Sequence, residues 1–248
     1  MGALEIVAIA AGGAAAGAIN AIVGSGSLVT FPVLVALGYP PVVANVTNTV
    51  GLVPGSVASA YGYRRELAGQ RNRILKMGGA SLLGAMVGAA LLLLLPTSVF
   101  DTVVPVIIVV AVLLVVFQPY LDRLIANRRT EGGGGGWLLT VLVFLTGVYG
   151  GYFSAAQGIL LLAVLGLGLN DSLQKVNALK NVLQALVNLV AAAVFVLIAD
   201  VAWVAAGVLA LGAVVGGGLG ARYGRRLSPR LLRALVAVIG TAAAIAMI

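Results

Sequence analysis

The stretch GAINAIVGSGSLVTFP (Gly17–Pro32) interrupts the first long apolar part of the chain. Its centre, Gly24-Ser25-Gly26-Ser27, disfavours a continuous helix because each glycine costs about 1 kcal/mol relative to alanine. Non-helical backbone at membrane depth is tolerated only where it is buried in protein or lines a polar cavity. Segments 4–23 and 27–37 are therefore predicted to form a broken or re-entrant hairpin. Its tip either lines a ligand site or is a packing contact between glycines.

The composition around this hairpin is that of a membrane protein. Hydrophobic residues make up 61% of the 248 residues and charged residues only 9%, whereas soluble domains carry roughly 25% charged residues. Several apolar runs approach the ~20 residues that span a bilayer. We predict an all-α polytopic membrane protein, with apolar segments at about 4–23, 27–37, 43–62, 74–95, 102–120, 137–157, 158–169, 173–199, 201–221 and 231–248.

Several classes of chemistry are excluded by what the chain lacks. It has no cysteine and no histidine, so disulfides, thiol chemistry and the usual metal ligand and proton shuttle are absent. Paired intramembrane carboxylates, metal-ligand clusters and nucleophile–base pairs are missing as well. A nucleotide-binding G-x-G-x-x-G fingerprint fails because position 29 is Val29. We expect no enzymatic activity, no cofactor and no metal.

The net charge of +8 is explained by membrane orientation. Thirteen of the 15 lysines and arginines lie in three short stretches, 64–76, 123–129 and 222–233. Clusters of this kind mark cytoplasmic loops of membrane proteins. The distribution favours contact with a lipid bilayer and argues against nucleic acid as a partner.

The chain divides into two similar halves. Residues 1–120 and 137–248 contain matching apolar segments, separated by a predicted cytoplasmic linker at 121–136 that ends in five glycines. Each half is predicted to hold a hairpin followed by three full spans. Because the three basic loops all face the cytoplasm, each half crosses the membrane an odd number of times. We therefore predict two inverted-topology repeats, an architecture that secondary transporters use with a site near the midplane.

A second polar stretch follows the second hairpin. In SLQKVNALKNVLQALVNL (Ser172–Leu189), a helix places four amides on one face, because their spacing is i, i+4, i+7 and i+11; they are Asn177, Asn181, Gln184 and Asn188. An offset of 129 residues aligns Asn48 with Asn177, and a fainter stripe marks the first half at Asn45, Asn48, Thr49, Ser56 and Ser59. The stripes either bond helices together or line a substrate path.

Two lysines lie outside the basic loops. Lys175 is expected either to reach the nearby cytoplasmic surface or to pair with Asp171, four residues earlier. Lys180 lies two turns inside the helix beside the hairpin tips, where a lone cation is costly. We expect its ammonium group to meet an anion.

These motifs resemble the TauE/SafE family of membrane proteins, often called sulfite exporters. The likeness covers nearly the whole chain. It rests on GAINAIVGSGSLVTFPVLVALGYPPVVANVTNTVGLVPGSVASAYGYRR, GVYGGYFSAAQGILLLAVLGLGLNDSLQKVNALKN and ADVAWVAAGVLALGAVVGGGLGARYGRRL. The family pattern has a glycine-rich turn after Asn20, the pair Thr47–Asn48 and the run Asn177–Lys180. The resemblance implies export or uptake of sulfite, sulfonates and related anions, whereas the residues alone indicate only a small anion.

We therefore expect a multi-pass transporter of the bacterial cytoplasmic (inner) membrane, with both termini outside, that exports sulfite or an organosulfonate by alternating access. An anion channel and a non-transporting scaffold or sensor are the alternatives. A homodimer is compatible with the small-residue runs Gly84/Gly88 and Gly212/Gly216/Gly220. The candidate substrate-binding residues are Asn20, Gly24, Ser25, Gly26, Ser27, Asn48, Gln157, Asn177, Lys180 and Asn181.

Overall fold

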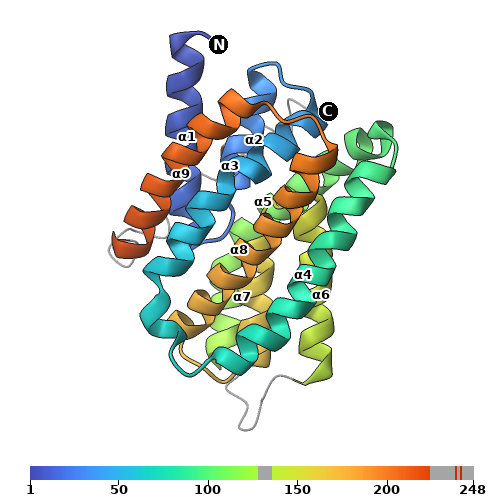
Figure 1. Ribbon diagram of the computed structural model, residues 1–248. Coiled ribbons are helices and arrows are strands. Elements are labelled where there is room, and N and C mark those ends of the chain that lie inside the picture. Colours follow the sequence, from blue (N-terminus) through green and yellow to red (C-terminus); the bar gives the residue numbers. More distant parts are fainter. Residues whose placement is uncertain (128–135, 224–237, 239–240, 242–248) are drawn as a thin grey trace.

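A computed structural model describes residues 1–127, 136–223, 238 and 241, and within them the chain is helical with no β-strand. The predicted all-α fold is therefore confirmed for this part of the chain, while the expected final segment 231–248 lies almost wholly outside it. The helices, shown in Figure 1, are α1 (Ala3–Ile22), α2 (Ser27–Ala36), α3 (Pro41–Gly62), the short 3₁₀ helix η1 (Arg64–Leu67), α4 (Arg71–Leu94), α5 (Thr97–Asn127), α6 (Trp137–Tyr152), α7 (Gln157–Gly168), α8 (Leu173–Ile198) and α9 (Trp203–Tyr223).

Two boundaries differ from the expected ones. Helix α6 ends at Tyr152 because Phe153 is extended, with φ −153° and ψ 107°; the expected apolar segment ran to residue 157. Helix α5 continues to Asn127, so the first part of the expected linker is helical. Residues 121–127 contain leucine, arginine, isoleucine and alanine and no glycine or proline, a composition that favours helix.

Helix length separates spans from hairpin arms. Among the described residues, five helices are long and apolar enough to cross a membrane: α1, α4, the Thr97–Gln118 part of α5, α8 and α9. The arms α2 and α7 have 10 and 12 residues, which is about 15 and 18 Å of helix. A hydrocarbon core is ~30 Å thick. The two short helices therefore reach only part-way through a bilayer.

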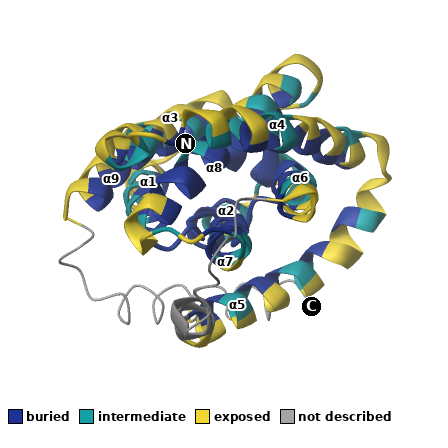
Figure 2. Ribbon diagram, turned by 90° about the horizontal axis from the view of Figure 1, so that it is seen from below, coloured by how far each residue is buried: buried dark blue, intermediate teal, exposed yellow. Residues whose placement is uncertain are grey.

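The short helices lie in the interior of the molecule. Viewed from below, α2 and α7 lie between α5 on one side and the layer that contains α3, α8 and α4 on the other (Figure 2), and α7 contacts α5 directly. Residues that face the interior are buried, including Phe31, Phe100 and Phe153, whose rings meet edge-to-face. The tips of both hairpins are thus surrounded by protein.

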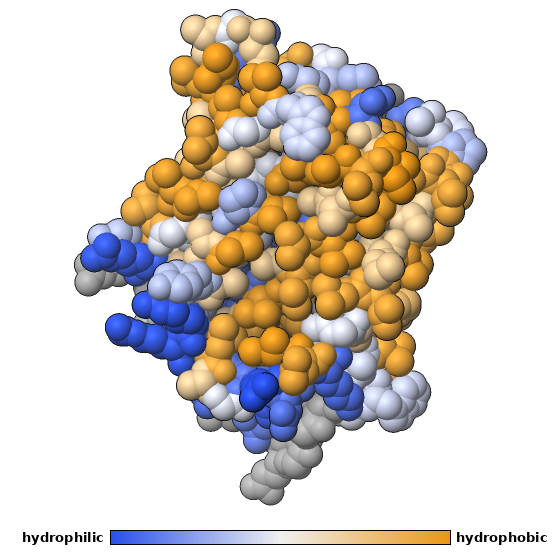
Figure 3. All heavy atoms as spheres, viewed as in Figure 1, coloured by the Kyte–Doolittle hydropathy of each residue, from blue (hydrophilic) through white to orange (hydrophobic). Residues whose placement is uncertain are grey.

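The outer surface has the polarity expected for contact with lipid. Large apolar side chains are openly exposed, such as Leu94, Leu197 and Leu211 at 81%, 82% and 74%. Figure 3 shows a broad apolar face, with hydrophilic residues gathered at the end where Figure 1 places the α3–α4 and α7–α8 connections. Exposed apolar area on this scale marks a surface that is covered by something other than water.

Glycines bring two helix pairs into backbone contact. Helix α1 packs on α9, and α4 packs on α6. A Cβ atom on Gly216 would lie 1.9 Å from the carbonyl oxygen of Ala14, and one on Gly88 would lie 2.0 Å from that of Val148. The small-residue runs on α4 and α9 therefore serve packing inside the chain, as close helix approach in membranes requires.

The close α1–α9 contact predicts that one added methyl group destabilises the protein at one position of α9 and not at another. Gly216→Ala should lower the free energy of unfolding by about 1–3 kcal/mol, because the added Cβ collides with backbone that cannot move aside. Thermal unfolding in detergent measures the change. Gly218→Ala is the matched control on the same helix, since its Cβ meets nothing within 4 Å; it should be neutral or stabilise by up to about 1 kcal/mol. Equal effects of the two substitutions would contradict this packing.

Candidate functional site

The two hairpin tips touch at a pair of glycines. The amide of Gly158 donates a 2.9 Å hydrogen bond to the carbonyl oxygen of Gly24. Gly24 has φ +89°, and a Cβ on it would lie 2.5 Å from the Cα of Gly158. Both the backbone conformation and the close approach therefore require glycine at Gly24.

Lys180 lies beside this contact with a completely buried side chain. Its ammonium nitrogen donates a 2.8 Å hydrogen bond to the main-chain carbonyl oxygen of Asn20, which belongs to the end of α1. Within the described residues this is the only polar partner of that nitrogen, and the single ion pair found there, between Arg73 and Asp171, lies elsewhere. The positive charge of Lys180 is thus not balanced by a carboxylate in the described part of the chain.

Helix α8 caps the broken end of α1. The last carbonyl groups of a helix have no partner within it. Here Lys180 donates to the carbonyl of Asn20, while the amide groups of Asn177 and Asn181 donate to the carbonyl of Ala21 at 3.3 and 3.2 Å. A cation at a helix C-terminus is also favoured by the helix dipole. Interhelical bonding therefore accounts for the amide nitrogens of Asn177 and Asn181.

The side chain of Asn20 holds the first tip in shape. Its oxygen accepts a 2.6 Å hydrogen bond from the amide of Gly26 and a 3.4 Å bond from the side-chain nitrogen of Gln184. Gln184 was not among the candidate site residues, although its spacing on the α8 stripe placed it on the same face. The stripe thus contacts the tip at more points than the candidate list included.

A second polar cluster joins the two tips to α2 and α3. The hydroxyl groups of Ser27 and Ser154 lie 2.8 Å apart, and the amide nitrogen of Asn48 donates to Ser27 at 3.2 Å. The hydroxyl of Thr30 donates to the side-chain oxygen of Asn48. Thr30 and Ser154 were missed; a usable signal for Thr30 was that it is the only polar side chain in the run 28–37.

Several buried polar atoms at the tips lack a partner within the described residues. They are the hydroxyl of Ser25, both amide atoms of Gln157 and the side-chain oxygen of Asn177. Leaving such atoms unpaired inside a protein costs free energy, so they are the atoms that a ligand would satisfy. Helices α2 and α7 also begin at these tips, and helix N-termini favour anions.

The two residues of the pair Thr47–Asn48 make contacts with different parts of the protein. Asn48 faces the tips, whereas the hydroxyl of Thr47 accepts a 3.0 Å hydrogen bond from the amide of Ala202, just before α9. Asn45, on the same helix, donates to the carbonyl of Tyr152 at 3.0 Å and so caps the end of α6. The polar stripe of α3 is therefore divided between helix ends and the tips.

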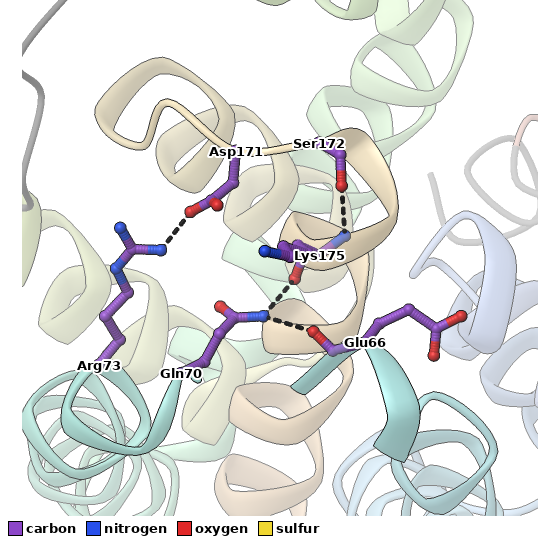
Figure 4. A network of polar contacts seen from close by, with 6 residues as sticks. All are labelled: Glu66, Gln70, Arg73, Asp171, Ser172 and Lys175. Atoms are coloured by element: carbon purple, nitrogen blue, oxygen red, sulfur yellow. Dashed lines mark hydrogen bonds and ion pairs between the residues drawn. The ribbon is translucent and has the colours of Figure 1, made fainter. Parts of the chain in front are cut away.

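Lys175 lies at the exposed, basic end and does not pair with Asp171. Asp171 instead pairs with Arg73 at the start of α4 (Figure 4). Of the two alternatives expected for Lys175, the structure has the exposed side chain. The i, i+4 pair with Asp171 does not form because Asp171 precedes the start of α8 at Leu173, so the two side chains do not share a helical face.

A hydrogen-bond bridge accompanies this ion pair. The side-chain nitrogen of Gln70 donates to the carbonyl oxygens of Glu66 and Lys175, at 2.9 and 3.2 Å (Figure 4). Gln70 is buried. Together with the pair Arg73–Asp171, it ties the α3–α4 connection to the α7–α8 connection. We call these four residues, Gln70, Arg73, Asp171 and Lys175, the basic-end latch.

Comparison with known proteins identifies the family. The family model "Sulfite exporter TauE/SafE" matches residues 9–247. The chain belongs to the TauE/SafE family. This TauE/SafE protein is 28% identical to a probable membrane transporter protein of Haemophilus influenzae, over 89% of this chain and 86% of the relative. It is 26% identical to the probable membrane transporter protein YfcA of Escherichia coli K12, over 90% and 82%. No solved structure matches it significantly.

Membership makes the protein a membrane transporter, which is not an enzyme class. The resemblance stated from the motifs is thereby confirmed over most of the chain, including the stretches that form both hairpins.

The shared carbonyl of Ala21 predicts non-additive mutational effects. Asn177→Ala or Asn181→Ala alone should cost less than about 1 kcal/mol of unfolding free energy, because the other amide still donates. The double variant leaves a buried carbonyl unpaired and should cost about 1–3 kcal/mol beyond the sum. Chemical or thermal unfolding of the purified protein measures this.

The control is the double variant Asn177→Ala with Asn188→Ala. Asn188 donates to the hydroxyl of Ser56 on α3, so it shares no partner with Asn177 and the two costs should add. Additivity in the Asn177/Asn181 pair as well would show that these amides do not share the end of α1.

Proposed function

We propose that this TauE/SafE transporter exports a small sulfur-containing oxyanion, sulfite or an organosulfonate, by alternating access through the site around Lys180. The observation that carries the proposal is the ammonium group of Lys180, which is completely buried and bonded only to a neutral carbonyl among the described residues. A buried cation without a counter-charge is costly inside a membrane protein. An anionic substrate would supply that charge.

The surroundings of Lys180 suit an oxyanion. The N-termini of α2 and α7 lie at the two touching tips, so two helix dipoles add positive potential there. The hydroxyl of Ser25 and the amide nitrogen of Gln157 are buried and free to donate. A tetrahedral or pyramidal oxyanion presents several acceptor oxygens, which these donors and the ammonium group would share.

The inverted-repeat architecture is part of this proposal, and the helix register supports it. Helices α3 and α8 begin at Pro41 and Leu173, and α4 and α9 begin at Arg71 and Trp203, so both pairs are 132 residues apart. The packing of α1 on α9 corresponds to that of α6 on α4. The offset of 129 expected from the stripes is replaced by 132, which pairs Asn45 with Asn177.

That register gives Asn45 and Asn177 the same task. Asn45 donates to the carbonyl of Tyr152 at the end of α6, and Asn177 donates to that of Ala21 near the end of α1. It also pairs Asn48 with Lys180. One half would therefore offer an amide at the position where the other half offers a cation, which makes the proposed site asymmetric.

Alternating access requires that contacts close one end while the other opens. The basic end is proposed to face the cytoplasm of the bacterial inner membrane, because basic loops stay inside, with both termini on the outer side. The contacts of the basic-end latch are proposed to close that face. Opening inward would break the latch and separate Gly24 from Gly158, while opening outward would leave the latch in place.

Membrane potential would drive the export. Moving one negative charge out of an inside-negative cell is favourable by about 2.3 kcal/mol per 100 mV. The buried polar side chains of the described residues include no carboxylate that would carry a coupled proton. Export as a uniport is therefore the simplest mechanism for this site.

Two other functions make different demands on the same residues. An anion channel needs a continuous aqueous path past the tips and would give single-channel currents in planar bilayers. A scaffold or sensor would use Lys180, Asn177 and Asn181 only to cap α1. The contacts of these three residues with the end of α1 favour this second alternative, so the experiment below is built to separate capping from transport.

The proposal predicts that Lys180→Met abolishes transport while the protein stays folded. In proteoliposomes loaded with sulfite, wild-type efflux should accelerate when the lumen is made negative. Efflux through Lys180→Met should fall at least tenfold, because the anion loses the buried positive charge that the described residues offer it. Thermal unfolding verifies that the variant is folded.

Lys175→Met is the matched control, since Lys175 belongs to the same helix, its side chain is exposed at the basic end, and only its main-chain carbonyl, which the substitution keeps, takes part in the latch. It should retain wild-type efflux. Sulfite efflux that persists in Lys180→Met would show that Lys180 only caps α1. Absence of sulfite efflux from the wild-type protein would support the scaffold or sensor function, and efflux that does not respond to the potential would rule out a uniport.

Reversing the charges of the basic-end latch tests its role. Because the chain contains no cysteine, a single introduced cysteine can report the result. A single cysteine placed by Asn181→Cys reports access to the site from the cytoplasmic side through a membrane-impermeant thiol reagent. Arg73→Asp or Asp171→Arg should speed its modification, because like charges then face each other and favour the inward-open state. The double reversal restores an ion pair and should return the rate toward that of the parent.

Arg71→Asp is the control, because Arg71 is an exposed residue in the same first turn of α4. It should leave the modification rate unchanged. A double reversal that is as fast as the single ones would show that this ion pair does not gate the site.

A further inference from the structure

Three buried asparagines, Asn45, Asn177 and Asn188, donate to other groups of the protein but have a side-chain oxygen without a partner among the described residues. The amide nitrogen of Asn177 donates to the carbonyl of Ala21, and that of Asn45 donates to the carbonyl of Tyr152. A main-chain carbonyl only accepts, so the orientation of each amide is determined by its partner. The side-chain oxygens of both asparagines are buried and have no partner among the described residues.

Asn188 follows the same pattern through a hydroxyl group. The hydroxyl of Ser56 donates to the carbonyl of Leu52 and therefore accepts from the amide nitrogen of Asn188. The oxygen of Asn188 is left buried without a partner in the described part of the chain. Unpaired acceptor oxygens therefore occur on both α3 and α8.

One of these acceptors lies at the proposed substrate site. Asn177 and Lys180 donate to adjacent carbonyl groups, those of Ala21 and Asn20, so both side chains meet the same end of α1. Gln157 begins α7 at the second tip, next to Gly158, and its amide oxygen is also unpaired. The site thus combines positive charge with at least two unsatisfied acceptors.

An anion that carries only acceptor oxygens cannot satisfy both requirements. It would pair with Lys180 but would leave the oxygens of Asn177 and Gln157 unpaired or facing like partial charges, at a cost. A ligand with an ammonium group would satisfy the acceptors but would be repelled by Lys180 and by the two helix N-termini. The chemistry that suits all of these groups is an anion with a neutral donor.

We infer that the cargo is a sulfonate that carries a hydroxyl donor beside its anionic group. This inference rests on the proposed function, since it assigns chemistry to the same site. The sulfonate oxygens accept from Lys180 and from the donors at the tips, and the hydroxyl donates to Asn177 or Gln157. Sites built to bond a substrate hydroxyl discriminate strongly against analogues that lack it, because their own buried groups are then left unpaired.

The test uses three sulfonates that differ in one heavy atom. Propane-1-sulfonate, 2-hydroxyethanesulfonate and 2-aminoethanesulfonate have the same chain length and end in methyl, hydroxyl and ammonium. Calorimetric titration of the purified wild-type protein should show 2-hydroxyethanesulfonate binding about tenfold more tightly than propane-1-sulfonate, the effect of one hydrogen bond to a buried acceptor. The amino compound should bind more weakly than the hydroxy compound.

Asn177→Leu tests the assigned acceptor. It should reduce the preference for the hydroxy compound to within about twofold. Asn181→Leu is the matched variant: Asn181 donates to the same carbonyl of Ala21 but adds no unpaired buried oxygen within the described residues, so the preference should persist whatever happens to the absolute affinity. If Asn177→Leu does not fold, the binding of the three sulfonates to the wild-type protein still tests the inference.

The outcomes separate this inference from the proposed function. Equal binding of all three sulfonates would overturn the hydroxyl assignment and leave an organosulfonate transporter intact. Tightest binding of the amino compound would overturn it as well. Sodium that raises the affinity for all three equally, without a preference among them, would show that the free oxygens hold a cation and would overturn it. Failure of every sulfonate and of sulfite to bind would overturn both.

Discussion

The hydrogen bond from Lys180 to the carbonyl of Asn20 is the interaction on which the centre of this protein depends. Breaking α1 inside a membrane leaves carbonyl groups that lipid cannot satisfy. Helix α8 supplies the missing donors and, with them, a positive charge that a neutral carbonyl does not balance. Structural capping and anion binding are therefore compatible roles for one residue, because capping uses a donor and leaves the charge free.

The other contacts between helices are of two kinds. Close backbone packing holds some helix pairs together, whereas polar contacts at the tips and the basic end can break. Helix α1 meets α9, and α4 meets α6, backbone against backbone at glycines, where no side chain can rearrange to accommodate a shift. The tips meet through the hydrogen bond between Gly24 and Gly158 and through the hydroxyl pair Ser27–Ser154. The latch at the basic end combines the partly exposed ion pair Arg73–Asp171 with the buried Gln70. Movement is expected at the tips and the latch, with the glycine-packed pairs moving as units.

Much of the fold was readable from the sequence because membranes impose simple rules. Apolar run length and the Gly24–Ser27 break predicted the helices and the first hairpin, and the helix starts differ from the expected ones by only a few residues. The end of α6 was mispredicted, and of the two alternatives for Lys175 the pair with Asp171 does not form. Both outcomes depend on where a helix ends or begins, which local composition determines weakly compared with packing.

The sequence by itself determined the helical membrane class, the stripe on α8 and the isolation of Lys180 from the basic loops. Periodicity and charge are local properties, so a single chain reveals them. Only the tertiary structure decided that Lys180 meets Asn20, that Asn48 faces Ser27, and which amide atoms remain unpaired. These facts arise from residues more than a hundred positions apart or on different helices. Their pairing depends on how the broken hairpins pack, and no local pattern encodes that.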